Sequence, residues 1–146
     1  MKFLILFGLL AVVFGIHSPY FSVSPEAIRQ GFVAVDFNHD GFMTLNEVQE
    51  FSKKRDLNGD GFVSYTEYKL SQPQKTPNRI VRGQFKYYDK LDGEIDDKIS
   101  PSGDVNLMNI LDTNKNGEVT LEEFEENMPK IVVGITKEID ALVVVG

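Results

Sequence analysis

The chain has 146 residues, of which 22 are Asp or Glu and 15 are Lys or Arg, and it contains no cysteine. This length predicts one compact domain or two very small ones, and the lack of cysteine excludes a disulfide-stabilised scaffold. A formal net charge of −7, with Lys and Arg scattered along the chain, argues against nucleic-acid binding and favours cations as partners.

The first predicted element is an N-terminal signal peptide. Lys2 is followed by an uncharged apolar run over residues 3–16, and a helix of about 21 Å is short for a bilayer core. Small residues at 13 and 15 predict removal of residues 1–15, which leaves a domain of residues 16–146 that has no membrane span and is secreted or held in the secretory lumen. Cleavage after Ser18 and an uncleaved anchor are the alternatives. Loss of Lys2 takes the net charge from −7 to −8.

The next predicted element is a helix from Pro25 to Val35. Ser24 is placed to cap it, Pro25 suits the first helical position, and Ile28, Phe32 and Val35 fall on one face. The segment that follows this helix is the first of three similar loops.

The three loops, at 36–47, 56–67 and 112–123, share one twelve-residue pattern. Each has oxygen-bearing side chains at positions 1, 3 and 5, Gly at 6, an apolar residue at 8 and Glu at 12. Calcium takes six to eight oxygens at about 2.3 to 2.6 Å, so the chain must curl around the ion, turn at the Gly and close with a bidentate carboxylate. We therefore predict three strong Ca²⁺ sites, with position 7 contributing its backbone carbonyl. The candidate ligands are Asp36, Asn38, Asp40, Phe42, Glu47, Asp56, Asn58, Asp60, Phe62, Glu67, Asp112, Asn114, Asn116, Glu118 and Glu123.

With these loops the chain resembles the EF-hand superfamily, and within it the calmodulin-like group broadly, over most of residues 25–128. The resemblance implies an all-α fold: an EF-hand array of helix-loop-helix units that work in pairs, with short β contacts between paired calcium loops.

The spacing of the first two loops is unusually close. Only 20 residues separate Asp36 from Asp56, so one helix, Leu45–Arg55, must leave the first loop and enter the second. The two loops then lie at opposite ends of this helix and should not pair with each other. We predict instead that Met43 meets Val119 and that Val63 meets Ile95.

A degenerate fourth hand is predicted at about residues 88–99, after a polar, Pro-containing linker at residues 71–77. Phe85 precedes Asp89 as Phe32 precedes Asp36, but the spacing is short and no Glu closes the loop. We expect this loop to act as a structural partner and to be empty of metal. Five carboxylates between residues 89 and 97 leave two interpretations open, a weak cation site and a solvated acidic loop.

The C-terminal region is predicted to be helical. Leu121, Phe124 and Met128 have helical spacing, and Pro129 should end or redirect that helix. Residues 129–145 carry Ile and Leu at helical spacing together with many β-branched residues, so a second helix is favoured over a short strand.

Function is predicted from the three loops and from the lack of known catalytic motifs. No nucleophile elbow, phosphate loop or His-rich metal triad occurs, so we do not expect an enzyme. The first hypothesis is a secreted calcium-binding protein that acts as a buffer, a carrier or an extracellular matrix component. The rival is a calcium sensor that exposes a hydrophobic groove for a partner helix, which the presence of only three Met residues after Met1 disfavours.

Overall fold

The structure is a computed structural model that describes residues 23–144, so the predicted signal peptide lies outside the described residues. Within them the chain is mostly helical, with six helices and four strands of two or three residues. The elements are, in chain order, α2 (Pro25–Val35), β1 (Phe42–Thr44), α3 (Leu45–Lys53), β2 (Val63–Ser64), α4 (Tyr65–Leu70), α5 (Asn78–Leu91), β3 (Lys98–Ile99), α6 (Ser102–Leu111), β4 (Glu118–Thr120) and α7 (Leu121–Val144).

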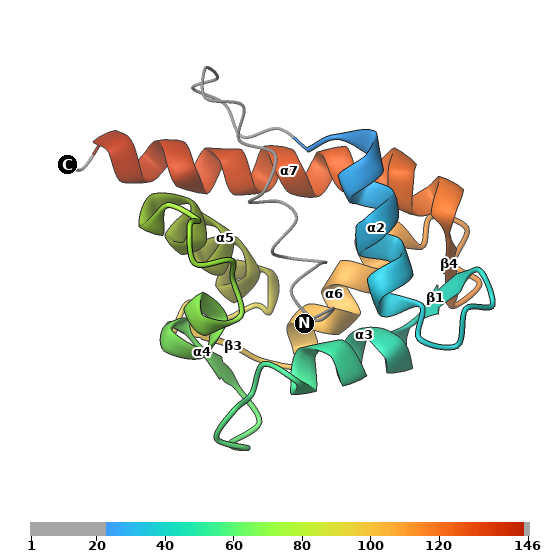
Figure 1. Ribbon diagram of the computed structural model, residues 1–146, viewed down its shortest axis with the longest axis horizontal. Helices are drawn as coiled ribbons and strands as arrows, with labels where there is room; N and C mark the ends of the chain where they lie inside the picture. The colour runs from blue at the N-terminus through green and yellow to red at the C-terminus, as the bar shows by residue number, and fades with distance from the viewer. Residues whose placement is uncertain (1–22, 145–146) are drawn as a thin grey trace.

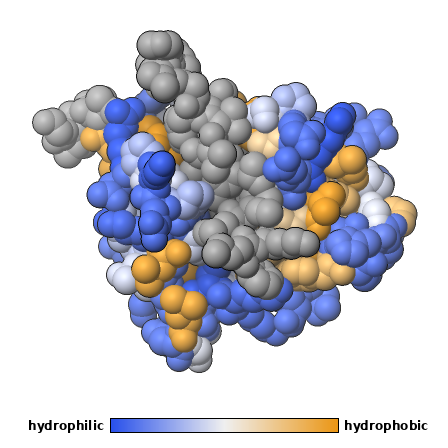
Figure 2. All heavy atoms as spheres, in the orientation of Figure 1, coloured by the Kyte–Doolittle hydropathy of each residue, from blue (hydrophilic) through white to orange (hydrophobic). Residues whose placement is uncertain are grey.

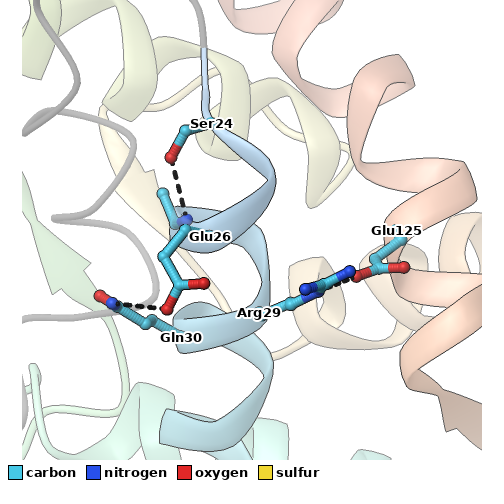
Figure 3. A network of polar contacts seen from close by, with 6 residues as sticks. Ser24, Glu26, Arg29, Gln30 and Glu125 are labelled. Carbon is cyan, nitrogen blue, oxygen red and sulfur yellow. Dashed lines mark hydrogen bonds and ion pairs between the residues drawn. The ribbon is translucent and has the colours of Figure 1, made fainter.

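Side-chain caps define where the helices around the first two loops begin. The Ser24 hydroxyl accepts a hydrogen bond from the Ala27 backbone N–H at 3.1 Å (Figure 3), so α2 starts as predicted. Thr44 opens α3 and Ser64 opens α4, each in a capping box with the Glu three residues later. The Glu that ends each of these two loop patterns is therefore also a member of the capping box at the start of the next helix.

The loops pair across two small antiparallel sheets (Figure 1). Met43 lies opposite Val119 in the β1–β4 pair, which confirms the prediction for the outer loops. Val63 lies opposite Ile99 in the β2–β3 pair, so the predicted partner Ile95 was wrong. Ile95 is 76% exposed, because the degenerate loop between α5 and α6 is longer than the pattern that was fitted to it. This loop is the third in chain order and is called the third loop below.

Helix α3 is shared by the first two loops, as the close spacing predicts. It ends at Lys53 rather than Arg55. The first loop pairs with the loop before α7 and the second with the loop before α6, so the paired loops come from distant parts of the chain.

Helices α2 and α7 flank the first sheet and are held together mainly by ring packing. Phe32 and Phe124 meet edge to face, with ring centroids 5.6 Å apart, and both are buried. The Arg29 Nε donates to Glu125 Oε1 at 2.7 Å across the same interface (Figure 3). That pair is solvent-exposed and contributes at most about 1 kcal/mol, less than burial of the two rings.

The centre of the core lies where α5 packs against α7 (Figure 1). Two glycines allow the helices to approach closely: a Cβ at Gly83 would overlap the Ile139 side chain, and a Cβ at Gly134 would overlap the Tyr87 ring. Phe85, on the buried face of α5, is fully enclosed. This contact joins the two loop pairs into one core.

Helix α7 runs without a break from Leu121 to Val144, so the prediction that Pro129 ends the helix was wrong. Proline removes one backbone hydrogen bond and costs about 3 kcal/mol inside a helix. Beyond it, Ile131, Ile135 and Ile139 are buried on one face, and each such side chain contributes about 1.5 to 3 kcal/mol. Their burial outweighs the proline. Within residues 23–144, none of the helices combines the length and the apolar character needed to cross a membrane.

Candidate metal centres in the loops

The first loop is shaped by the carboxylate of its first residue. Asp36 is 5% exposed, and its two oxygens accept backbone N–H groups from Asp40 at 3.2 Å and from Gly41 at 3.0 Å. The Phe42 N–H in turn donates to Asp40 Oδ1 at 2.9 Å. These bonds curl the chain around the side-chain oxygens that the sequence analysis proposed as ligands.

The loops at 56–67 and 112–123 repeat this arrangement. Asp56 accepts the N–H groups four and five residues later at 3.1 and 2.8 Å, and Asp112 accepts the corresponding groups at 3.2 and 2.8 Å. The turn residues Gly41, Gly61 and Gly117 have φ of 86°, 88° and 87°. Space for a side chain exists at all three, so it is the left-handed backbone that requires glycine there.

The closing glutamates face back into their loops. In Glu47, Glu67 and Glu123, one carboxylate oxygen accepts the N–H of the residue three positions earlier, at 3.0, 2.8 and 3.1 Å. The other oxygen accepts an N–H near the loop start, at 3.1, 2.9 and 3.3 Å. Backbone N–H groups, with that of Ser64 and that of Thr120 the largest cause, lower the pKa of Glu67 and Glu123. These groups are therefore carboxylates at neutral pH, the form that binds a cation.

The fifteen predicted ligand residues fall into three sets, one in each loop, and hydrogen bonds join members of each set. In residues 23–144 no group of three or more His, Cys, Asp or Glu side chains is arranged to hold a metal ion by itself. The predicted ligand set of each loop instead combines Asn amide oxygens and a backbone carbonyl with two or three carboxylates. An all-oxygen set of this kind fits a hard cation such as Ca²⁺ better than zinc or copper.

The third loop has a different register from the one predicted. Asp96 and Asp97 donate their N–H groups to Asp89 at 3.2 and 3.3 Å, which is what positions 5 and 6 do in the other loops. Asp97 takes a φ of 63° at the place where the other loops have Gly. Seven positions separate Asp89 from Asp96, against four between Asp36 and Asp40, so this loop carries a three-residue insertion.

In the third loop, Asp92 makes the closing hydrogen bond that a glutamate makes in the other loops. Its Oδ2 accepts the Ser100 N–H at 2.7 Å, the bond that the closing Glu makes in the other loops. The chain position of that Glu is Gly103, where a Cβ would lie 3.3 Å from the Asp92 Cβ. The third loop is thus closed by its own side chain, a role that the sequence analysis missed. The apolar–Ser pair at Ile99 and Ser100, which matches Val63 and Ser64, is the signal that could have revealed it.

Replacing Asp92 by Ala is expected to lower the free energy of unfolding by about 1 to 3 kcal/mol, because the backbone N–H groups of Glu94 and Ser100 lose their part-buried acceptor. The number of bound calcium ions should stay the same. Glu94→Ala, at an exposed side chain of the same loop, is the matched control and should change stability by less than about 0.5 kcal/mol. Urea unfolding and calcium titration measure both quantities. A lost calcium ion in the Asp92 variant would show that this loop is a site.

A cavity of about 240 Å³ lies between the second and third loops and is bordered by Asp56, Val63, Ile99 and Asp104. Asp104 is 8% exposed and accepts a hydrogen bond from the Ser52 hydroxyl at 2.7 Å. Loss of solvent around this carboxyl raises its pKa to about 6. No sequence pattern marked Asp104, because only the packing of α3 against α6 buries it.

The raised pKa of Asp104 gives a pH-dependent prediction. A carboxyl whose pKa is 3.8 when unfolded and about 6 when folded stabilises the fold below about pH 4, and this contribution is lost as the pH rises through 6. Asp104→Asn should therefore gain about 3 kcal/mol of stability relative to wild type between pH 4 and pH 7. Urea unfolding at saturating calcium measures the difference, and the exposed Asp140→Asn is the control. A pH-independent difference would contradict the prediction.

Comparison with known families finds the EF hand at residues 54–70 and 106–128. These ranges contain the loops at 56–67 and 112–123. Searches of curated proteins and of solved structures found no match. The two matched regions each hold one of the loops whose hydrogen bonds are described above, and the match supports calcium binding as the general activity. The family matches at these two regions support assignment of the chain to the EF-hand calcium-binding superfamily.

Proposed function

We propose that the protein binds three calcium ions, one in each of the loops 36–47, 56–67 and 112–123, and that it acts outside cells as a buffer, a carrier or a matrix component. The observation that supports three sites is the common geometry. In each loop the first Asp accepts two backbone N–H groups and the final Glu faces the loop interior. The degenerate loop between α5 and α6, which is closed by Asp92, is proposed to carry no ion.

Charge supports the same proposal. The loops at 36–47 and 56–67 each present three ligand carboxylates, whereas the loop at 112–123 presents two because Asn116 stands in place of an Asp. Three ions would bring the charge of the secreted chain from −8 to −2, which relieves repulsion among carboxylates. With equal rigidity, the loop at 112–123 should bind most weakly.

A buffer or matrix role is favoured over a sensor by the placement of the methionines. Met43, Met108 and Met128 are 0%, 7% and 6% exposed, all within the core. A sensor groove relies on flexible Met side chains that a partner helix can reach. A hydrophobic dye separates the two functions: calcium should decrease its fluorescence as folding is completed, and a large increase would favour the sensor.

Glu67→Gln is expected to remove one calcium ion of three, since the amide retains the shape of the side chain but loses the bidentate carboxylate. Glu47→Gln and Glu123→Gln should each do the same. Isothermal titration counts the ions. The control is Glu122→Gln, an exposed neighbour of Glu123, which should still bind three. Unchanged stoichiometry in any of the first three variants would reject that loop as a site.

The proposed location has its own test. Expression of the full chain in a secreting eukaryotic cell should place the protein in the medium with residue 16 as its first residue. Retention of residues 1–15 on a membrane-bound product would contradict secretion.

A further inference from the structure

Positive charge is concentrated in one segment of this acidic protein. Residues 69–90 contain six Lys and Arg and a single acidic residue, Asp89, which is 2% exposed. The remaining chain is correspondingly more acidic. The expectation from sequence that Lys and Arg are scattered is thus wrong for this segment, which spans the end of α4, the linker and α5.

Four of the six basic residues form a line on one helix. Arg79, Arg82, Lys86 and Lys90 follow one another at intervals of three, four and four residues in α5, so they lie on one face and span about 16 Å. We call this face the basic stripe. The opposite face, with Phe85 among its residues, is buried. Where Figure 2 shows α5 and the segment before it, the surface is mostly hydrophilic.

Few carboxylates neutralise these charges. Lys90 pairs with Glu138 at 2.6 Å, and Arg82 lies 3.9 Å from Asp97. Among the described residues, no carboxylate is within ion-pair distance of the others, which are Lys69, Lys75, Arg79 and Lys86. Their charges are therefore available to an anionic partner.

The start of α5 also favours an anion. Its first turn has no acidic residue and no side-chain cap. In addition, the positive charge of Arg79 in this turn lies near the positive end of the helix dipole, which is unfavourable without a nearby anion. Like charges three or four residues apart cost a few tenths of a kcal/mol per pair. The basic stripe is therefore unfavourable for α5 alone, and a polyanion would relieve that cost.

A cavity of about 550 Å³ opens beside the start of α5, where Asn78 and Val81 border it. Its lining is mixed, with Lys69, Thr76, Asn78 and Gln72 among its residues. Gln72 is 5% exposed, and its Oε1 has no hydrogen-bond partner within the described part of the chain. A ligand that offers hydroxyl donors as well as negative groups would suit both the cavity and the stripe.

We propose that the basic stripe and this cavity bind an acidic polysaccharide of the sulfated glycosaminoglycan class. Sulfate groups would lie along the stripe and sugar hydroxyls would enter the cavity. A membrane or a protein partner would need apolar anchors, and none of the exposed large apolar side chains in residues 23–144 lies on α5, while only Leu70 borders the cavity. The surface lies outside the calcium loops, so the proposal does not depend on the proposed calcium function.

Heparin is the probe for the test, with the full secreted chain at 150 mM NaCl and 2 mM calcium. Wild type should bind, with affinity that falls steeply as salt increases. The triple variant Lys75→Ala/Arg79→Ala/Lys86→Ala should bind at least tenfold more weakly. The control Lys53→Ala/Lys130→Ala/Lys137→Ala removes three charges from other surfaces and should stay within twofold of wild type.

Three results would overturn this proposal. One is the absence of heparin binding by wild type, and another is an equal loss of affinity in the two triple variants. The third is tighter binding to a polyglutamate peptide, duplex DNA or anionic phospholipid vesicles than to heparin at the same salt. Circular dichroism and calcium titration of both variants, each expected to match wild type, separate loss of the surface from loss of the fold.

Discussion

Removal of calcium is expected to lower the free energy of unfolding by on the order of 10 kcal/mol. An ion that binds only the folded chain adds about 3 to 4 kcal/mol at 100 to 1,000 times its dissociation constant, and three sites are proposed. Since small domains have only about 5 to 15 kcal/mol in total, the calcium-free protein should be largely unfolded or poorly ordered. Urea unfolding with calcium and with EGTA measures this change.

The expected loss has an electrostatic cause that suggests its control. Without calcium, Asp36, Asp40 and Glu47 hold their negative charges close together in one loop, and the loop at 56–67 does the same. Magnesium prefers a smaller, octahedral site and should restore much less stability than calcium at equal concentration. Identical unfolding midpoints in calcium and EGTA would contradict the three-site proposal.

Replacing Phe85 by Ala is expected to destabilise the protein by about 3 to 5 kcal/mol. The ring is fully buried, with its centroid 5.4 Å from that of Tyr65 and 5.7 Å from that of Tyr68. Both tyrosines belong to α4, so removal of the ring would leave a cavity between α4 and α5. Urea unfolding at saturating calcium measures the loss.

Phe37→Ala is the control for this prediction. It deletes the same ring from a loop position that is 38% exposed, where the ring lies beneath the Lys54 ammonium at 4.0 Å. Its cost should be about 1 kcal/mol or less. A similar cost for the two variants would show that burial of Phe85 against α4 contributes no more than a surface ring does.

Local patterns predicted the loops and their neighbours well. The conformation of each loop is determined by twelve consecutive residues, and the capping of α2 by Ser24 depends only on the next three residues. The pairing of Met43 with Val119 followed from a length argument, because the short α3 cannot bring its own two loops together. Metal ligation by the loop residues stays a prediction.

Features that depend on distant contacts could not be predicted in this way. Pro129 continues a helix because of the core beneath α7, and the pKa of Asp104 depends on burial between α3 and α6. The third loop was misaligned because its insertion hides the equivalence of Asp97 with the glycines. The sequence alone could not show that Arg79 and Lys86 lie on the exposed side of α5, because this depends on which face of the helix is buried.

Calcium titration of the wild-type chain, by calorimetry or equilibrium dialysis, tests whether its loops bind three calcium ions. We predict uptake of three ions per chain, accompanied by an increase in helical circular dichroism. A chain that takes up no calcium at millimolar concentration, and melts at the same temperature with and without it, would contradict the account.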